Sequence, residues 1–188
     1  MSEIVGRSAY VIAIAGVVAL VAIVLFFAVG QPFGTINDLS AVVETLALAP
    51  VMFGFYELGG RTPITAARVS LVSGVAAVLV WSIVQVAMVL GLVTFDYVRP
   101  AIGGFAIEAV ALIVIGAWLS GANLLAGPWL PGRLRWLGAM AGFGFALLGL
   151  GLLLGGLKHT LTYLGGVGYQ LLFPLWGLLL GRVLDRRS

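Results

Sequence analysis

The chain has 188 residues, of which 62% are hydrophobic and 9% are charged, and its mean hydropathy is +1.17. This composition excludes a water-soluble domain, which would leave large apolar surfaces in contact with water. The formal net charge of +3 arises from ten Lys and Arg residues spread along the ends of apolar segments, which favours membrane topology over nucleic-acid binding. The lack of cysteine excludes disulfides, a thiol nucleophile and cysteine metal sites.

Six apolar segments follow one another, each close to the length of about 20 residues that a helix needs to cross a bilayer. We predict spans at residues 8–29, 39–58, 67–93, 101–119, 134–154 and 161–180. The connectors between them are rich in Gly, Pro, Asn, Asp or charge, as helix ends and turns require. Because lipid cannot hydrogen-bond the backbone and the segments lack the alternation of barrel strands, we predict an all-α, integral-membrane, six-helix bundle forming one domain, residues 1–188.

The first connector carries the run Phe-Gly-Thr-Ile-Asn-Asp at residues 33–38. We expect Asn37 or Asp38 to cap the second span, since either side chain can accept hydrogen bonds from free N–H groups at a helix start. The run, followed by a span that contains Pro50, resembles a loop of uncharacterised prokaryotic multi-pass membrane proteins. That resemblance covers residues 31–50, and it implies a small bacterial or archaeal membrane protein without assigning any catalytic residue.

Four polar side chains lie within the predicted spans, on the side of the membrane that the Asp38 connector faces. They are Glu44, Gln85, Glu108 and Gln170. Counting residues from the span ends places the two acids roughly 8 and 10 Å deep. A charge at bilayer depth costs about 2.5–3.5 kcal/mol on insertion scales, so such side chains usually face protein or water. Small residues flank both acids at helical spacing, so we expect the carboxyls to point into the bundle and meet the two amides.

Two interpretations of these four residues are open. In the first, they line an outward-facing polar pocket that binds a small cation, a proton or an amphipathic ligand, as in a transporter or channel. In the second, the acids are protonated or hydrogen-bonded to the glutamines and only fix the register of the helices. We expect no enzyme activity, metal or cofactor, because the lone His159 lies at a helix start and no known catalytic motif accompanies the acids. An intramembrane lipid enzyme is the least favoured function.

Glycine and proline positions predict how the spans pack. Pro50 and Pro174 lie inside their spans and should bend them, since each frees a backbone carbonyl. Small residues four apart allow helix backbones to approach closely, and three glycine pairs have this spacing: Gly138/Gly142, Gly151/Gly155 and Gly177/Gly181. We expect them to pack within the chain. Alternatively they join copies in a homo-oligomer or dock the chain on a larger membrane complex, which would make it a non-catalytic scaffold or accessory subunit that also contacts membrane lipid.

The basic residues predict the orientation. Eight cations fall on one side of the membrane (Arg7, Arg61, Arg68, Arg133, Arg135, Arg182, Arg186 and Arg187), and Arg99 and Lys158 fall on the other. The positive-inside rule therefore places both termini in the cytoplasm of a cell with a prokaryotic inner or plasma membrane. Each returning span has an acid or amide in its outer half and a later glycine, so we also predict three tandem hairpins, 1–60, 61–123 and 124–188, whose even-numbered spans meet on a common axis. Chance similarity between unrelated hairpins is the alternative.

Overall fold

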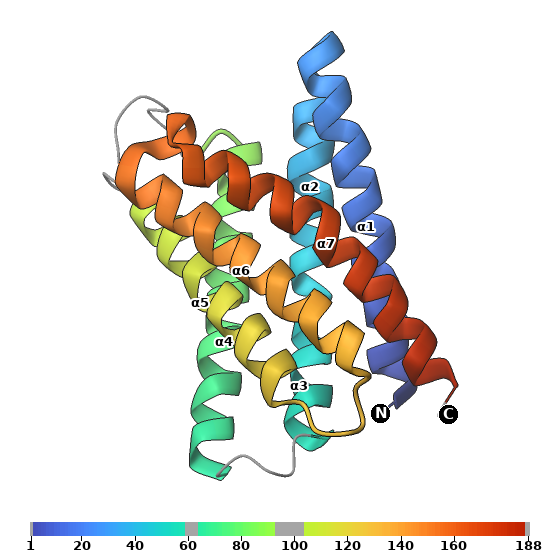
Figure 1. The fold of residues 1–188 in the computed structure, drawn as a ribbon. Helices are drawn as coiled ribbons and strands as arrows, with labels where there is room; N and C mark the ends of the chain where they lie inside the picture. The colour runs from blue at the N-terminus through green and yellow to red at the C-terminus, as the bar shows by residue number, and fades with distance from the viewer. Residues whose placement is uncertain (1, 59–63, 93–103, 187–188) are drawn as a thin grey trace.

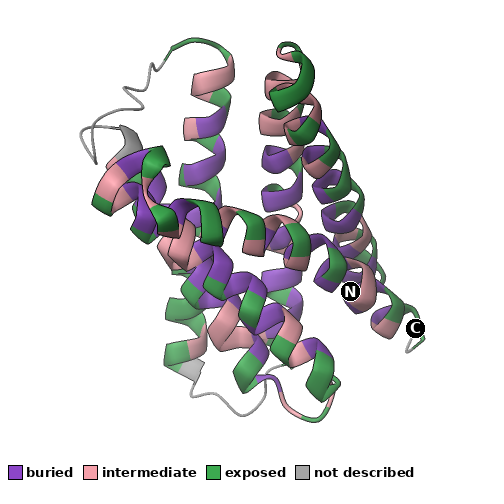
Figure 2. Ribbon diagram, turned by 45° about the horizontal axis from the view of Figure 1, so that its top comes forward, coloured by how far each residue is buried: buried purple, intermediate pink, exposed green. Residues whose placement is uncertain are grey.

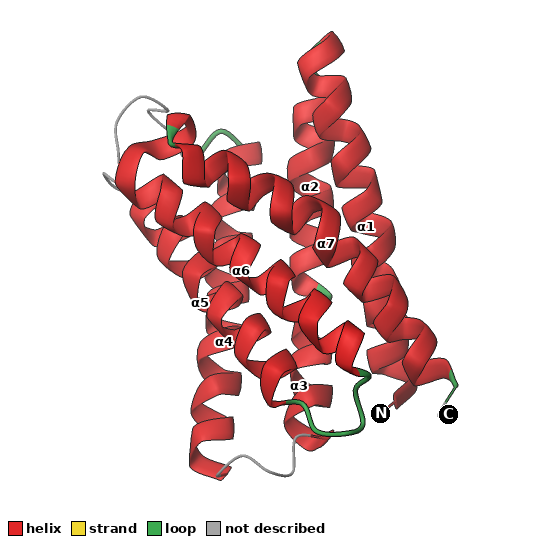
Figure 3. Ribbon diagram, in the orientation of Figure 1, coloured by secondary structure: helices red, strands yellow, loops and turns green. Residues whose placement is uncertain are grey.

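The computed structural model describes residues 2–58, 64–92 and 104–186, and this part of the chain contains helices and no strand (Figure 3). The helices, shown in Figure 1, are α1 (Ser2–Val29), α2 (Phe33–Leu46), α3 (Leu48–Leu58), α4 (Ile64–Val89), α5 (Gly104–Leu125), α6 (Gly132–Gly155), the short 3-10 helix η1 (Gly156–Lys158) and α7 (Thr160–Asp185). When α2 and α3 are counted as one span, six helical segments are long and apolar enough to cross a membrane. The predicted all-α architecture with six spans is confirmed. The membrane and the orientation stay predictions.

The six spans are arranged in chain order around a closed ring (Figure 1). Each span packs against the spans before and after it, and α7 returns to pack along α1. The α5–α6 and α6–α7 pairs have the most extensive contacts. Near the chain ends, the hydroxyl of Tyr10 on α1 donates a 2.7 Å hydrogen bond to Asp185 on α7. The start of the first helix and the end of the last helix therefore lie side by side, at what we call the termini end of the bundle.

Aromatic rings from the even-numbered spans meet inside the ring of helices. Phe55 on α3 lies 5.9 Å from Trp118 on α5 and 6.1 Å from Trp176 on α7, measured between ring centroids. Trp176 in turn stacks on Phe173 of the same helix at 5.7 Å. Such offset and edge contacts between buried rings stabilise a core beyond the area that they bury. These contacts bring side chains of the even-numbered spans together, whereas the common axis and the hairpin repeat stay predictions.

The glycines lie where helices of the bundle pack closely against each other. A Cβ atom at Gly142 would lie 2.6 Å from the carbonyl oxygen of Gly116, and one at Gly177 would lie 2.8 Å from that of Ala9. All six glycines of the three predicted pairs face other parts of the same chain within 4 Å in this way. The glycine stripes therefore serve packing between helices of one chain, as the default interpretation predicts.

The outer faces of the helices are apolar and exposed, whereas buried residues face the ring interior (Figure 2). Large hydrophobic side chains that are about half exposed or more occur on every span, for example Val21, Phe53, Ile83, Val110, Phe143 and Val167. Soluble monomers seldom expose contiguous apolar surface of this extent. The six apolar helices and their exposed apolar faces are consistent with a polytopic membrane protein.

The ends of α4 and α5 are two of the helix boundaries that differ from the prediction. The fourth helix ends at Val89 instead of residue 93, because Gly91 has a φ of 68° and starts a Schellman-type end. There the N–H of Gly91 bonds to the carbonyl of Met88, and the N–H of Leu92 bonds to that of Ala87. The fifth helix continues to Leu125 instead of residue 119, so residues 120–125 are helical and not part of a connector.

The capping prediction at the first connector is wrong. The second span begins at Phe33, so Asn37 and Asp38 lie inside α2 and cannot cap it. The side chain of Gln31 serves the helix start instead, since its Oε1 accepts from the backbone N–H of Thr35 at 3.4 Å. The helix bounds differ at the two prolines, and the predicted bends themselves stay predictions. The span is interrupted at Ala47, three residues before Pro50, whereas α7 continues through Pro174.

Candidate functional site

Glu44 lies in the last turn of α2 at the junction of three helices. Its side chain is 1% exposed, and its Oε1 atom makes no hydrogen bond within the described part of the chain. A Cβ atom at Gly16 of α1 would overlap both Glu44 Oε1 and the ring of Pro174 on α7. The missing side chain at Gly16 therefore makes the room in which this carboxyl lies between α1, α2 and α7.

Glu108 lies near the start of α5, and its carboxyl is hydrogen-bonded to a side chain of α4. Its Oε1 accepts a 2.7 Å hydrogen bond from Nε2 of Gln85, and both side chains are 7% exposed. Trp81, one turn earlier on α4, lies close to the same carboxyl, yet neither its Nε1 nor Glu108 Oε2 is in hydrogen-bonding geometry. Ser82 beside it also has a buried hydroxyl without a partner among the described residues. One oxygen of Glu108 is fixed by an amide, and the other stays unpaired.

Gln170 on α7 is half-buried and is paired with its neighbour. Its Nε2 donates a 2.8 Å hydrogen bond to the hydroxyl of Tyr169, and its Oε1 is buried without a partner in the part of the chain described. The Tyr169 hydroxyl is close enough to Glu44, Glu108 and Asp38 to interact with these carboxyls electrostatically. Pro174 offers no N–H group, so the backbone carbonyl of Gln170 also lacks its usual helical donor. Tyr169 and Gln170 therefore form a hydrogen-bonded pair of polar side chains in the interior of the bundle.

The four residues predicted from the sequence are brought together in part. Gln85 and Glu108 are in direct contact. Gln170 is hydrogen-bonded to Tyr169, and Glu44 lies within electrostatic range of the same tyrosine. The three cavities described for this structure are lined by other residues and not by these four. The outward-facing pocket therefore stays a prediction, and residues 93–103, which hold one outer connector, lie outside the described residues.

Sequence analysis missed two polar groups of the interior. Tyr169 was not singled out, although a hydroxyl directly before Gln170 in an apolar run was an available signal. Asn123 was assigned to a connector, yet it is fully buried in α5. Its Nδ2 donates to the carbonyl of Leu119 at 2.8 Å, and its Oδ1 accepts from Nε1 of Trp176 at 2.9 Å. These two bonds satisfy the amide and explain why a polar residue can lie in the core.

Within residues 2–58, 64–92 and 104–186, no three His, Cys, Asp or Glu side chains come together to hold a metal ion. His159 instead caps α7, where its Nδ1 accepts from the backbone N–H of Leu161 at 3.3 Å. Glu44 and Glu108 can each bind or release a proton, since one unpaired oxygen is enough for that.

Comparisons with known proteins add nothing to this site, because no family model, curated protein or solved structure matches the chain. The resemblance of residues 33–38 to a prokaryotic membrane-protein loop stays a prediction. The chemistry of the chain follows from its own geometry, namely two buried acids with unpaired oxygens inside a ring of six apolar helices.

Proposed function

We propose that this chain is a multi-pass cell-membrane protein that binds and transfers protons through the outer half of its helix bundle, with Glu44 as the principal proton-binding group. The observation that carries the proposal is the burial of Glu44, which is 1% exposed with Oε1 unpaired. Ionisable residues within membrane spans are expensive, and they commonly belong to ion pathways or proton relays.

The physical reason is the cost of an isolated buried charge. A carboxylate taken out of water without a cation or hydrogen-bond donor is destabilised far more than a neutral carboxyl. Glu44 has no cation beside it among the described side chains, so a bound proton is the smallest partner that neutralises it. A metal ion would need several converging ligands.

Three further groups supply a route. Asp38 is half-buried toward the outer end of α2, and Tyr169 lies within electrostatic range of the three carboxyls. The hydroxyl of Tyr169 accepts from Gln170, which leaves its own hydrogen free to donate. Glu108 is the second carboxyl, since Gln85 holds Oε1 and Oε2 is unpaired. A proton that enters beside Asp38 would pass by Tyr169 to Glu44 or Glu108.

Proton flux in liposomes tests the proposal. Purified protein is reconstituted in vesicles that contain a pH-sensitive dye, and a potassium diffusion potential drives protons inward. Glu44→Gln should lower the protein-dependent flux at least about tenfold, because proton transfer through a positioned side chain contributes on the order of 100-fold or more. The matched control is Glu57→Gln, which removes an exposed acid on α3 and should leave the flux unchanged. Equal flux in all three proteins would refute the proposal, and sodium or potassium uptake without a pH change would replace the proton with a metal cation.

Infrared spectroscopy tests proton binding independently of transport. A protonated carboxyl has a carbonyl stretch that shifts when its hydrogen is exchanged for deuterium. Wild-type protein should show this band from the buried acids, and Glu44→Gln should lose part of it while Glu57→Gln retains all of it. Because glutamine is a neutral isostere, the folded bundle should survive the substitution, which thermal unfolding in detergent would check.

The role as a scaffold or accessory subunit is the alternative function. Its support in the sequence was the near absence of soluble loops and catalytic groups, and the glycines expected to dock the chain on a complex pack within the chain instead. No contact in the described part of the chain favours that role over proton binding. A purified monomer free of other chains that moves protons would decide between the two functions.

A further inference from the structure

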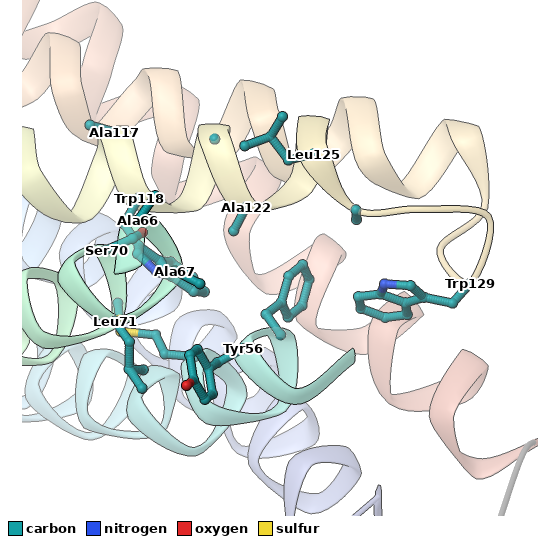
Figure 4. A pocket seen from close by; sticks show the side chains of 14 residues that line it. Tyr56, Ala66, Ala67, Ser70, Leu71, Ala117, Trp118, Ala122, Leu125 and Trp129 are labelled. Carbon is teal, nitrogen blue, oxygen red and sulfur yellow. The ribbon is translucent and has the colours of Figure 1, made fainter. Parts of the chain in front are cut away.

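A cavity of about 260 Å³ lies at the termini end of the bundle, far along the helices from the buried acids. It is bounded by α3, the start of α4, the end of α5 and the connector at residues 126–131. Figure 4 shows Trp129 at one end of the cavity and Ser70 and Trp118 at the other, with Tyr56 beside them. Its remaining walls are mostly alanine and leucine, so the interior is apolar and aromatic.

The cavity opens sideways into a groove on the outer surface of the bundle. A second cavity between α4 and α5 shares Ala66, Ser70, Ala117 and Trp118 with the first and continues to Ser73. From Ala66 to Ser73 the groove runs roughly 10 Å along α4 at the rise of an α-helix. Ser73 and Ala117 are exposed on the face that we assign to lipid. An acyl chain can therefore enter from the bilayer without crossing a polar layer.

The polar groups at the cavity are donors and cations. Trp129 has a buried Nε1–H with no acceptor among the described residues. The Nε of Arg68, an exposed residue on α4, donates to the hydroxyl of Tyr56 at 3.4 Å. Arg135 on α6 donates to the carbonyl of Ala126, which lines the cavity, at 3.1 Å. Among the described residues that line the two cavities there is no Asp or Glu. This set suits a ligand with an anionic, hydrogen-bond-accepting head and an apolar tail.

We propose that the cavity and its groove bind one anionic phospholipid of the cytoplasmic leaflet. One acyl chain lies in the groove between α4 and α5, and the phosphate lies near Arg68 and Tyr56. Basic pockets between spans on the cytoplasmic side are known to bind anionic lipid head groups. The proposal is independent of proton transfer, because it involves none of Glu44, Glu108, Gln85 or Gln170.

Native mass spectrometry of the detergent-purified protein, titrated with phosphatidylglycerol or phosphatidylcholine, tests the lipid site. Wild type should retain one phosphatidylglycerol molecule in preference to phosphatidylcholine. Arg68→Gln should reduce this preference about fivefold, as expected for the loss of one basic residue near an anionic lipid. The control Arg186→Gln removes an exposed cation at the same end and should retain the preference.

A second pair of variants tests the groove itself. Gly121 lines the cavity, and a Cβ atom there would meet nothing within 4 Å, so Gly121→Leu should fill the cavity without disturbing the fold. Gly166 on α7 is equally open but lies away from the cavity, which makes Gly166→Leu the matched control. Gly121→Leu should abolish retention of the single lipid, and Gly166→Leu should keep it. Equal retention by both variants, or equal binding of both lipids by wild type, would overturn the proposal.

Discussion

Two neighbouring glycines on α7 allow the packing between α6 and α7 to be measured separately from helix propensity. A Cβ atom at Gly165 would overlap the backbone nitrogen of Leu148 and lie 2.7 Å from the carbonyl oxygen of Gly144, both on α6. A Cβ atom at Gly166 would meet nothing within 4 Å. Backbone atoms cannot move aside as a flexible side chain can, so the overlap at Gly165 must separate the two helices.

The substitutions Gly165→Ala and Gly166→Ala therefore share one effect and differ in another. In a helix interior, alanine is favoured over glycine by about 1 kcal/mol, and this gain is common to both variants. Overpacking of a well-packed interface costs typically about 1–3 kcal/mol, and only Gly165→Ala incurs it. We expect Gly166→Ala to be neutral or stabilising. Gly165→Ala should be less stable than Gly166→Ala by about 1–3 kcal/mol.

Equilibrium unfolding in mixed micelles of mild detergent and dodecyl sulfate measures this difference through tryptophan fluorescence. Wild type and both variants are unfolded under identical conditions, and the slopes of the transitions are compared to check that the unfolded states are equivalent. The quantity of interest is the difference between the two variants, from which helix propensity cancels. If both variants unfold at the same denaturant fraction, α6 and α7 do not approach at Gly165 as the structure describes.

Two other predictions use groups outside the proposed sites. Asn123→Leu should lower the free energy of unfolding by about 1–3 kcal/mol, because it leaves the buried Nε1–H of Trp176 unpaired. A double-mutant cycle with Trp176→Phe measures the interaction energy between the two side chains. If the two substitutions have additive effects on the free energy of unfolding, the bond is contradicted. The orientation of the chain in the membrane can be measured with single introduced cysteines, since the chain has none of its own. A membrane-impermeant maleimide added to intact cells should label Lys158→Cys and leave Arg133→Cys unlabelled. The reverse pattern would contradict the orientation predicted from the positive-inside rule.

The sequence was sufficient to predict the spans because length and apolarity decide whether a segment crosses a bilayer. It was misleading at two polar sites. Asn123 is a residue type common in loops, but its bonds with the carbonyl of Leu119 and with Trp176, 53 positions away, allow it to be helical and buried. Asn37 and Asp38 are residue types that often cap helices, but the helix starts earlier, where the Gln31 side chain accepts from the N–H of Thr35. Residue type alone reveals neither set of hydrogen bonds.

The same limit applies to the two acids, which have equivalent depth and similar small neighbours in the sequence. The structure distinguishes them by what faces each helix. Across from Glu108 lies the amide of Gln85, so one of its oxygens fixes the register of α4 and α5 and the other stays unpaired. Across from Glu44 lie Gly16 and Pro174, neither of which offers a side-chain donor. The structure thus shows an amide-paired oxygen at Glu108 and an unpaired buried oxygen at Glu44, and both interpretations open at the sequence level stay predictions. That asymmetry is why Glu44, and not Glu108, is the substitution on which the proposed function depends.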